Sequence, residues 1–232
     1  MNIRCFLIAA MILFMAGQIA AQKNDAKKDL TFKVGGVKII TPAPSDDFVE
    51  VGDDNRSKLE VLAPERNRLI SAFLEKADLQ NLIDGKDPAM DRYALVEISR
   101  GAEYADCSAD NFKEVIAEMK NSFGELIAQS FKESEDEINR KLKELDLKDV
   151  SLGEAKQLGS FFSKKNAFSF GLMTTVKNGE ESKNMIVGGV IVRVKLRLIY
   201  LYLFAEYKNE ESVKWLGMTV EKWTDEVLKI NK

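Results

Sequence analysis

The chain has 232 residues, with 34 Lys and Arg, 37 Asp and Glu, and no histidine. A hydrophobic content of 45% with 9% aromatic residues is ordinary for a globular protein, and excludes a disordered or collagen-like chain and a polytopic membrane protein. The lack of histidine excludes a Ser-His-Asp triad, a Cys-His dyad and a histidine-ligated zinc site.

The first 21 residues have the pattern of a secretory signal peptide. Arg4 precedes an apolar run from Cys5 to Gly17, and the small residues Ala20 and Ala21 follow it. We therefore expect cleavage near Ala21 and a periplasmic or secreted protein. The sequence then predicts a flexible leader over 22–30 and a single domain over 31–232. Without residues 1–21 the chain loses one Arg and no acid, leaving 33 basic and 37 acidic side chains and a net charge of −4, which gives no electrostatic reason to bind nucleic acid.

The first half of the chain predicts strands separated by turns. Extended pieces are expected around Phe32–Val34 and Val37–Ile39, with Gly35-Gly36 between them. Residues 45–62 have an irregular pattern. Strands are predicted over 67–75 and 92–100, with turn chemistry over 81–88.

The second half adds helices and a meander of strands. Helices are predicted from Ser108 or Asp110 to about Gln129, over 133–147, and over 209–230. Strands are expected over 155–162, 167–176 and 185–202. We expect a loop longer than two residues at Asn178-Gly179 and a bulge at Gly188-Gly189. Neighbouring strands with helices set apart favour an α+β fold, a mainly antiparallel sheet with helices packed on it.

Catalytic and metal-binding motifs are missing from the sequence. Cys107 precedes a predicted helix, but Asp106 and Asp110 flank it and no histidine exists to act as its base, so we interpret it as structural. The acidic run over 133–137 is interpreted as the start of a solvated helix. No phosphate-binding glycine motif or calcium-loop spacing is present. The sequence thus indicates no catalytic residue, no cofactor and no metal.

A basic strand face is the main candidate binding feature. Arg193, Lys195 and Arg197 alternate with apolar residues, which predicts three cations on one side of a strand, joined by Arg66 and Arg68. Such a face could attract an anionic partner or head group. The alternative is a solvated face whose cations pair with neighbouring acids.

Three segments resemble a known group of proteins: NRLISAFL (67–74), RYALVEISRGAEYADCSADNF (92–112), and the chain from Val192 to Asn231. They are similar to uncharacterised exported bacterial proteins, and the last segment resembles the strand–helix end of the PsbP/Mog1-like α/β/α sandwich. The resemblance implies an antiparallel sheet with helices on both faces. It carries no residue roles, because fold alone does not define function.

These observations favour a non-enzymatic binding or accessory module whose partner is another envelope or secreted protein. A small hydrolase that uses carboxylates or Tyr and Lys as acid and base is one alternative. A binder of anionic lipid surfaces, in peripheral contact with a membrane, is the other. The sequence does not define the oligomeric state.

Overall fold

A computed structural model of the chain describes residues 30–52, 56, 59–60, 63–84, 86, 88–121, 123–144 and 149–232. The predicted signal peptide and nearly all of the predicted leader lie outside these residues, as do several positions of the 45–62 segment. Among the described residues, no helix is both long enough and apolar enough to cross a membrane.

Two antiparallel sheets contain all the described strands. The strands β1 (Leu30–Val34) and β2 (Val37–Thr41) form a hairpin around Gly35-Gly36, as predicted. The larger sheet has the order β3-β4-β5-β11-β10-β9-β6, with β7 and β8 also paired to β9. Its strands are β3 (Phe48–Glu50), β4 (Asn67–Glu75), β5 (Arg92–Ser99), β6 (Val150–Leu152), β7 (Lys156–Gly159), β8 (Ser163–Lys164), β9 (Ala167–Asn178), β10 (Glu181–Val194) and β11 (Arg197–Glu206).

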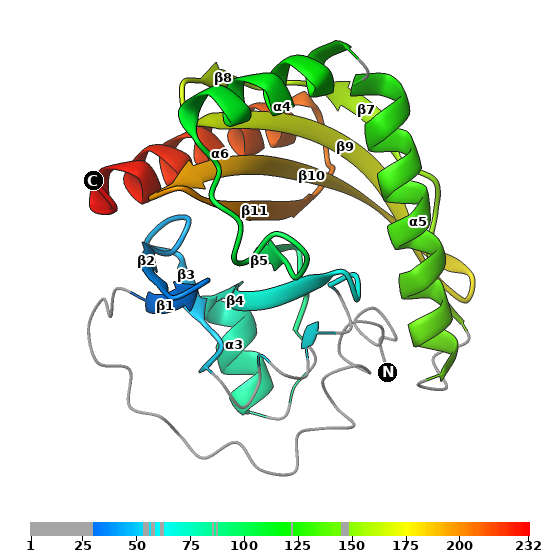
Figure 1. Cartoon of the computed structure of the whole chain (residues 1–232). Coiled ribbons are helices and arrows are strands. Elements are labelled where there is room, and N and C mark those ends of the chain that lie inside the picture. Colours follow the sequence, from blue (N-terminus) through cyan, green and yellow to red (C-terminus); the bar gives the residue numbers. More distant parts are fainter. Residues whose placement is uncertain are drawn as a thin grey trace.

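Helices cover both faces of the larger sheet (Figure 1). On one face, α6 (Glu210–Ile230) buries Leu216, Val220 and Trp223 against β10, β11 and β5. On the other face, α4 (Ala109–Asn121) buries Phe112 and Ile116 against aromatic residues of β9 and β11. The helix α5 (Phe123–Glu144) continues from α4 past β6 and β7 toward the start of β4. The expected α+β fold, with a mainly antiparallel sheet and helices packed on it, is confirmed.

Several predicted boundaries are wrong. A short helix α3 (Lys76–Ile83) occupies part of the expected 81–88 turn. The helix expected to reach Gln129 ends at Asn121, and the second begins at Phe123 instead of near Glu133. The acidic run over 133–137 therefore lies inside α5, away from its start. Ser108 caps α4, since its hydroxyl accepts a hydrogen bond from the Asn111 amide at 3.0 Å.

The strand meander also differs in its turns. Asn178 pairs directly with Glu181, so the β9–β10 loop has two residues, not the longer loop expected. Gly188 and Gly189 stay in continuous register with both neighbouring strands, so the expected bulge is absent from this described segment. A Cβ at Gly189 would lie 2.2 Å from the Phe170 ring, so this glycine makes room for an aromatic side chain. The predicted 185–202 strand is broken by a turn at Lys195-Leu196.

Candidate functional site

A cleft of about 370 Å³ lies between the start of β4 and the second half of α5. The connection that enters β4 forms one wall, and residues of the last helical turns of α5 form another. The lining residues are Glu60, Ala63, Pro64, Glu65, Asn67, Leu69, Arg100, Lys141 and Glu144. Charged side chains therefore dominate a cavity of modest volume. We call it the α5 cleft.

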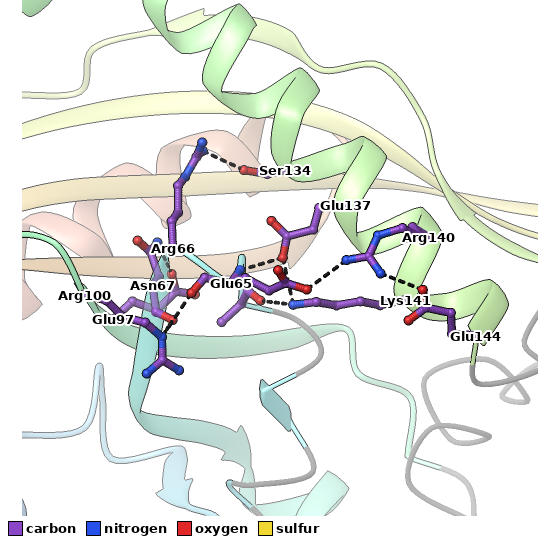
Figure 2. A network of polar contacts seen from close by, with 11 residues as sticks. Glu65, Arg66, Asn67, Glu97, Arg100, Ser134, Glu137, Arg140, Lys141 and Glu144 are labelled. Atoms are coloured by element: carbon purple, nitrogen blue, oxygen red, sulfur yellow. Dashed lines mark hydrogen bonds and ion pairs between the residues drawn. The ribbon is translucent and has the colours of Figure 1, made fainter.

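The α5 wall of this cleft is held by a network of ion pairs and hydrogen bonds (Figure 2). Arg140 bridges two carboxylates, Glu65 at 2.8 Å and Glu144 at 2.6 Å. Glu137 accepts the Glu65 backbone N–H at 2.5 Å and pairs with Lys141 at 2.8 Å. Burial alone would raise the pKa of Glu137, but these partners outweigh it and leave the pKa below its ordinary value. The network ties α5 to the segment that enters β4.

Two arginines fix the start of β4 itself. Arg66 donates to Glu133 at 2.7 Å and to both Ser130 and Ser134 hydroxyls, at 2.8 and 3.0 Å. Its hydrogen bond is the main cause that lowers the pKa of Glu133. Arg100 donates through Nε to the carbonyls of Glu65 and Asn67, each at 3.0 Å. The backbone on this side of the cleft is thus held in one position before any ligand arrives.

Glu97 is a buried carboxylate directly behind the cleft. Alternation along β5 puts it on the same sheet face as Tyr93 and Leu95, and its side chain is only 2% exposed. Asn67, which lines the cleft, donates its amide to Glu97 Oε2 at 2.7 Å. Burial raises the pKa of Glu97 to about 7, against the opposing effects of the Asn67 hydrogen bond and the charges of Arg66 and Lys141.

Two tyrosines of β11 share the sheet face of Glu97. Tyr200 is its direct cross-strand partner, and Tyr202 lies two residues further along the same face. Burial is the main cause that raises the pKa of both phenols, and the Glu97 charge adds to it. Both tyrosines therefore stay protonated near neutral pH, so they can donate hydrogen bonds but are poor bases.

A second cavity, of about 330 Å³, lies at the start of α6. Its charges are matched within the chain. Arg92 pairs with Glu75 and stacks over the Trp215 ring, 4.9 Å from the centroid. Asp91 pairs with Lys183 at 2.5 Å and with Lys208 at 3.6 Å. These contacts explain the cavity as a site where strand ends are joined by ion pairs and where Arg92 stacks on Trp215 of α6.

The predicted basic face is not formed by one strand. Lys195 lies in the turn between β10 and β11, with a φ of 47°, and it is exposed. Arg193 is paired with Leu198 and Arg197 with Val194, so the two arginines point to opposite faces of the sheet. The expectation of three cations on one side is wrong, because the turn interrupts the alternation that predicted it.

Both arginines instead bind backbone carbonyls of neighbouring segments. Arg193 donates to the Cys107 carbonyl at 2.8 Å and to the Asn166 side chain at 3.0 Å. Arg197 is 8% exposed and pairs with Asp106. The other two predicted contributors, Arg66 and Arg68, pair with Glu133 and Glu103.

Cys107 has the environment of a structural residue. It is 7% exposed, and its backbone N–H donates to the Leu196 carbonyl at 2.7 Å. Burial raises the pKa of its thiol, although the Arg193 charge opposes the shift. Among the described residues, no group of three or more Cys, Asp and Glu side chains is placed to hold a metal ion.

The sequence predicted this site only in part. Of these residues, the sequence pattern indicated only Arg66, as a contributor to the basic face. Arg140 and Lys141 escaped notice because single cations on a polar helix resemble any solvated helix face. The signal that could have found them is their i,i+4 spacing from Glu144 and Glu137, which builds a charged stripe along α5.

No model of a known protein family matches the sequence, and no curated protein matches it either. Solved structures with a similar fold include the Ran-binding protein Mog1p of Saccharomyces cerevisiae, at 11% identity and a TM-score of 0.34, covering 88% of this chain and 94% of that one. Cyanobacterial PsbP (CyanoP) from Synechocystis sp. PCC 6803 is similar at 12% identity and a TM-score of 0.40, covering 89% and 96%.

Proposed function

We propose that the chain is an exported, non-enzymatic binding module that receives a side chain of a protein partner in the α5 cleft. The observation that supports this proposal is the balance between acidic and basic side chains in the lining of the cleft. Lys141 and Arg100 already donate to backbone carbonyls, at 3.0 Å in each case. The acids Glu60, Glu65 and Glu144 are all exposed, and Glu65 and Glu144 share one cation, Arg140, so negative charge is in excess at the lining. A cleft with exposed acids favours a partner segment that carries a basic side chain.

The size and rigidity of the cleft support the same function. Its volume of about 370 Å³ is at the low end for small-molecule pockets, and suits one or two side chains of a larger partner. The walls are fixed by hydrogen bonds from Arg66 and Arg100 and by the Arg140 bridge, so little ordering would be required on binding.

A photo-crosslinking amino acid at position 144 tests this proposal. Glu144 is 59% exposed and pairs with Arg140 within α5, and Glu226 on α6 is a matched control at 52% with Lys229 as its partner. In the envelope fraction, we expect a defined protein adduct from position 144 and none from position 226. The same adduct from both positions, or none from position 144, would contradict the proposal.

A second candidate function, acid–base hydrolysis through Glu97, is favoured by its pKa of about 7. It requires Asn67 to move aside, because Asn67 lines the cleft and Glu97 does not. The isosteric Glu97→Gln variant separates the two functions. If the variant loses a hydrolytic activity of the wild-type protein and keeps the position-144 adduct, the hydrolase is supported. If the adduct is unchanged and neither the wild-type protein nor the variant is active, the binding module is supported.

A further inference from the structure

Three turns meet at the end of the sheet where β5 finishes. They are Gly35-Gly36 of the β1–β2 hairpin, residues 104–106 between β5 and α4, and Lys195-Leu196 between β10 and β11, and together we call them the turn cluster. Figure 1 shows the β1–β2 hairpin beside this end of β10 and β11. None of its residues lines either of the two cavities described above.

Arg197 joins the three turns into one surface. Its guanidinium donates to the carbonyls of Val34 at 3.3 Å, Gly35 at 3.4 Å and Ala105 at 3.1 Å, and pairs with Asp106. Gly35 permits this approach, since a Cβ there would lie 2.3 Å from the Glu103 carbonyl oxygen. The exposed parts of the cluster are therefore held in fixed relative positions.

Two apolar side chains project from the turn cluster. Tyr104 is 78% exposed and Leu196 is 42% exposed, and they are two of the four large hydrophobic side chains exposed in the described part of the chain. Leu196 has a φ of 67°, in the left-handed region that favours Asn or Gly in a two-residue hairpin turn. The turn thus accepts a disfavoured conformation and presents an apolar side chain to solvent, which points to a use for that side chain.

Exposed lysines lie on the β1–β2 hairpin and in the β10–β11 turn. Lys33 and Lys38 are direct cross-strand partners in the hairpin, an arrangement that places like charges side by side. Lys195 joins them, since its ammonium donates to the Lys38 carbonyl at 3.2 Å. The acids nearby are already paired, Glu103 with Arg68 and Asp106 with Arg197. Within the described residues, no acid forms an ion pair with any of the three lysines.

We propose that the turn cluster docks the protein on a bilayer that contains anionic lipid. Tyr and Leu at the tips of separate turns suit the interface between head groups and acyl chains, and the lysines complement anionic head groups. An anionic surface would also relieve the repulsion between Lys33 and Lys38. Side chains that project from separate turns suit contact with a broad, flat surface. An extended peptide would instead require a groove or a free strand edge as its binding site.

Vesicle co-sedimentation tests this proposal. The wild-type chain, purified from the exported fraction, should sediment with vesicles of phosphatidylcholine and phosphatidylglycerol and not with phosphatidylcholine alone, and high salt should release it. Replacing Lys33, Lys38 and Lys195 with Gln should weaken partitioning by roughly two orders of magnitude. A matched triple, Lys113→Gln, Lys143→Gln and Lys177→Gln, removes the same charge from exposed positions elsewhere and should bind as wild type does.

A second pair of variants tests the apolar tips. Leu196→Gly suits the positive φ, so the melting temperature should be unchanged or higher while vesicle binding falls by roughly tenfold. Tyr104→Ser should also weaken binding, whereas Met218→Ser, at a residue that is 66% exposed on α6, should not.

Three outcomes would overturn the proposal. The first is binding that does not depend on phosphatidylglycerol. The second is equal loss in the two lysine triples, which would reflect net charge alone. The third is binding to polyglutamate without binding to vesicles, which would assign the turn cluster to an acidic polypeptide instead.

Discussion

Glu97 is the residue whose environment has the clearest consequence for stability. Folding raises its pKa from 4.5 to about 7, so the folded chain holds this proton more tightly than the unfolded chain does. The stabilisation is full below pH 4.5 and is lost as the pH rises toward 7. The shift corresponds to a loss of about 3 kcal/mol in the free energy of unfolding between the two ends of this pH window.

Glu97→Gln removes this titration and keeps an acceptor for the Asn67 amide. We expect the variant to match the wild type near pH 4 and to exceed its free energy of unfolding by about 3 kcal/mol at pH 8. Urea unfolding of both proteins across this range measures the difference, which cancels the contributions of Glu75 and Asp78, whose pKa values burial also raises. A constant difference at every pH would show that Glu97 is not the titrating group.

At the scale of single elements, α6 holds the small hairpin against the main sheet. Asn231 at its end accepts from the Ile40 N–H at 2.9 Å and donates to the Ile40 carbonyl at 2.7 Å. Trp223 donates from its indole to the Pro42 carbonyl at 2.7 Å. The helix therefore contributes polar contacts to β2 as well as its apolar face to the sheet.

Asn231→Ala should loosen the hairpin without unfolding the domain. The Ile40 amide would lose its partner, so hydrogen exchange at Ile40 should accelerate while amides of β10 and β11 stay protected. Asn209→Ala, which removes the cap that accepts from Glu211 and Ser212 at the other end of α6, is the control and should leave Ile40 protected. Equal acceleration in both variants would assign the effect to the helix as a whole.

Trp223 tests the apolar face of α6. It is 1% exposed and meets the Phe73 ring edge-on, with centroids 6.1 Å apart. Trp223→Ala should lower the free energy of unfolding by about 3–5 kcal/mol, as for other large-to-small changes in a core. Chemical denaturation measures the loss, with Trp215→Ala as a comparison at a partly exposed position. A smaller loss at Trp223 than at Trp215 would contradict the assignment of the core face.

The elements predicted correctly are those in which one local pattern decides the structure. The apolar runs of β4 and β5 and the 3-and-4 spacing of α6 reflect burial on a defined face, which leaves a direct trace in sequence. The β10–β11 turn left no such trace, because Lys195 and Leu196 are neither glycine nor asparagine. Its conformation is imposed by strand pairing and by Cys107, which donates to the Leu196 carbonyl.

The α5 cleft was beyond prediction for a related reason. Its walls come from residues about 75 positions apart, such as Glu65 and Arg140. Each is an ordinary exposed charge in its own segment, and only the path of α5 across the sheet brings the two together. The sequence shows Glu97 as a charged residue within an apolar run. Nothing in the sequence marks Asn67 as its hydrogen-bond partner.

At the scale of the whole molecule, the two proposed surfaces are neighbours. Arg100 lines the α5 cleft, and Tyr104 in the turn cluster follows four residues later, a span of at most about 14 Å even if fully extended. Arg197 and Arg100 fix the backbone on either side of this segment. A protein partner held in the cleft would therefore lie close to the proposed bilayer surface.

The proposed function includes export of the chain, and residues 1–21 should direct this. Arg4, the apolar run of 13 residues and Ala20-Ala21 predict cleavage before Gln22, since the run is shorter than the roughly 20 residues of a spanning helix. Mass spectrometry of the exported protein should find an N-terminus at Gln22. Ala21→Lys should block processing and leave a longer chain, whereas Lys27→Gln, beyond the site, should be processed normally. An exported wild-type protein that keeps Met1 would refute cleavage and make residues 1–21 an anchor.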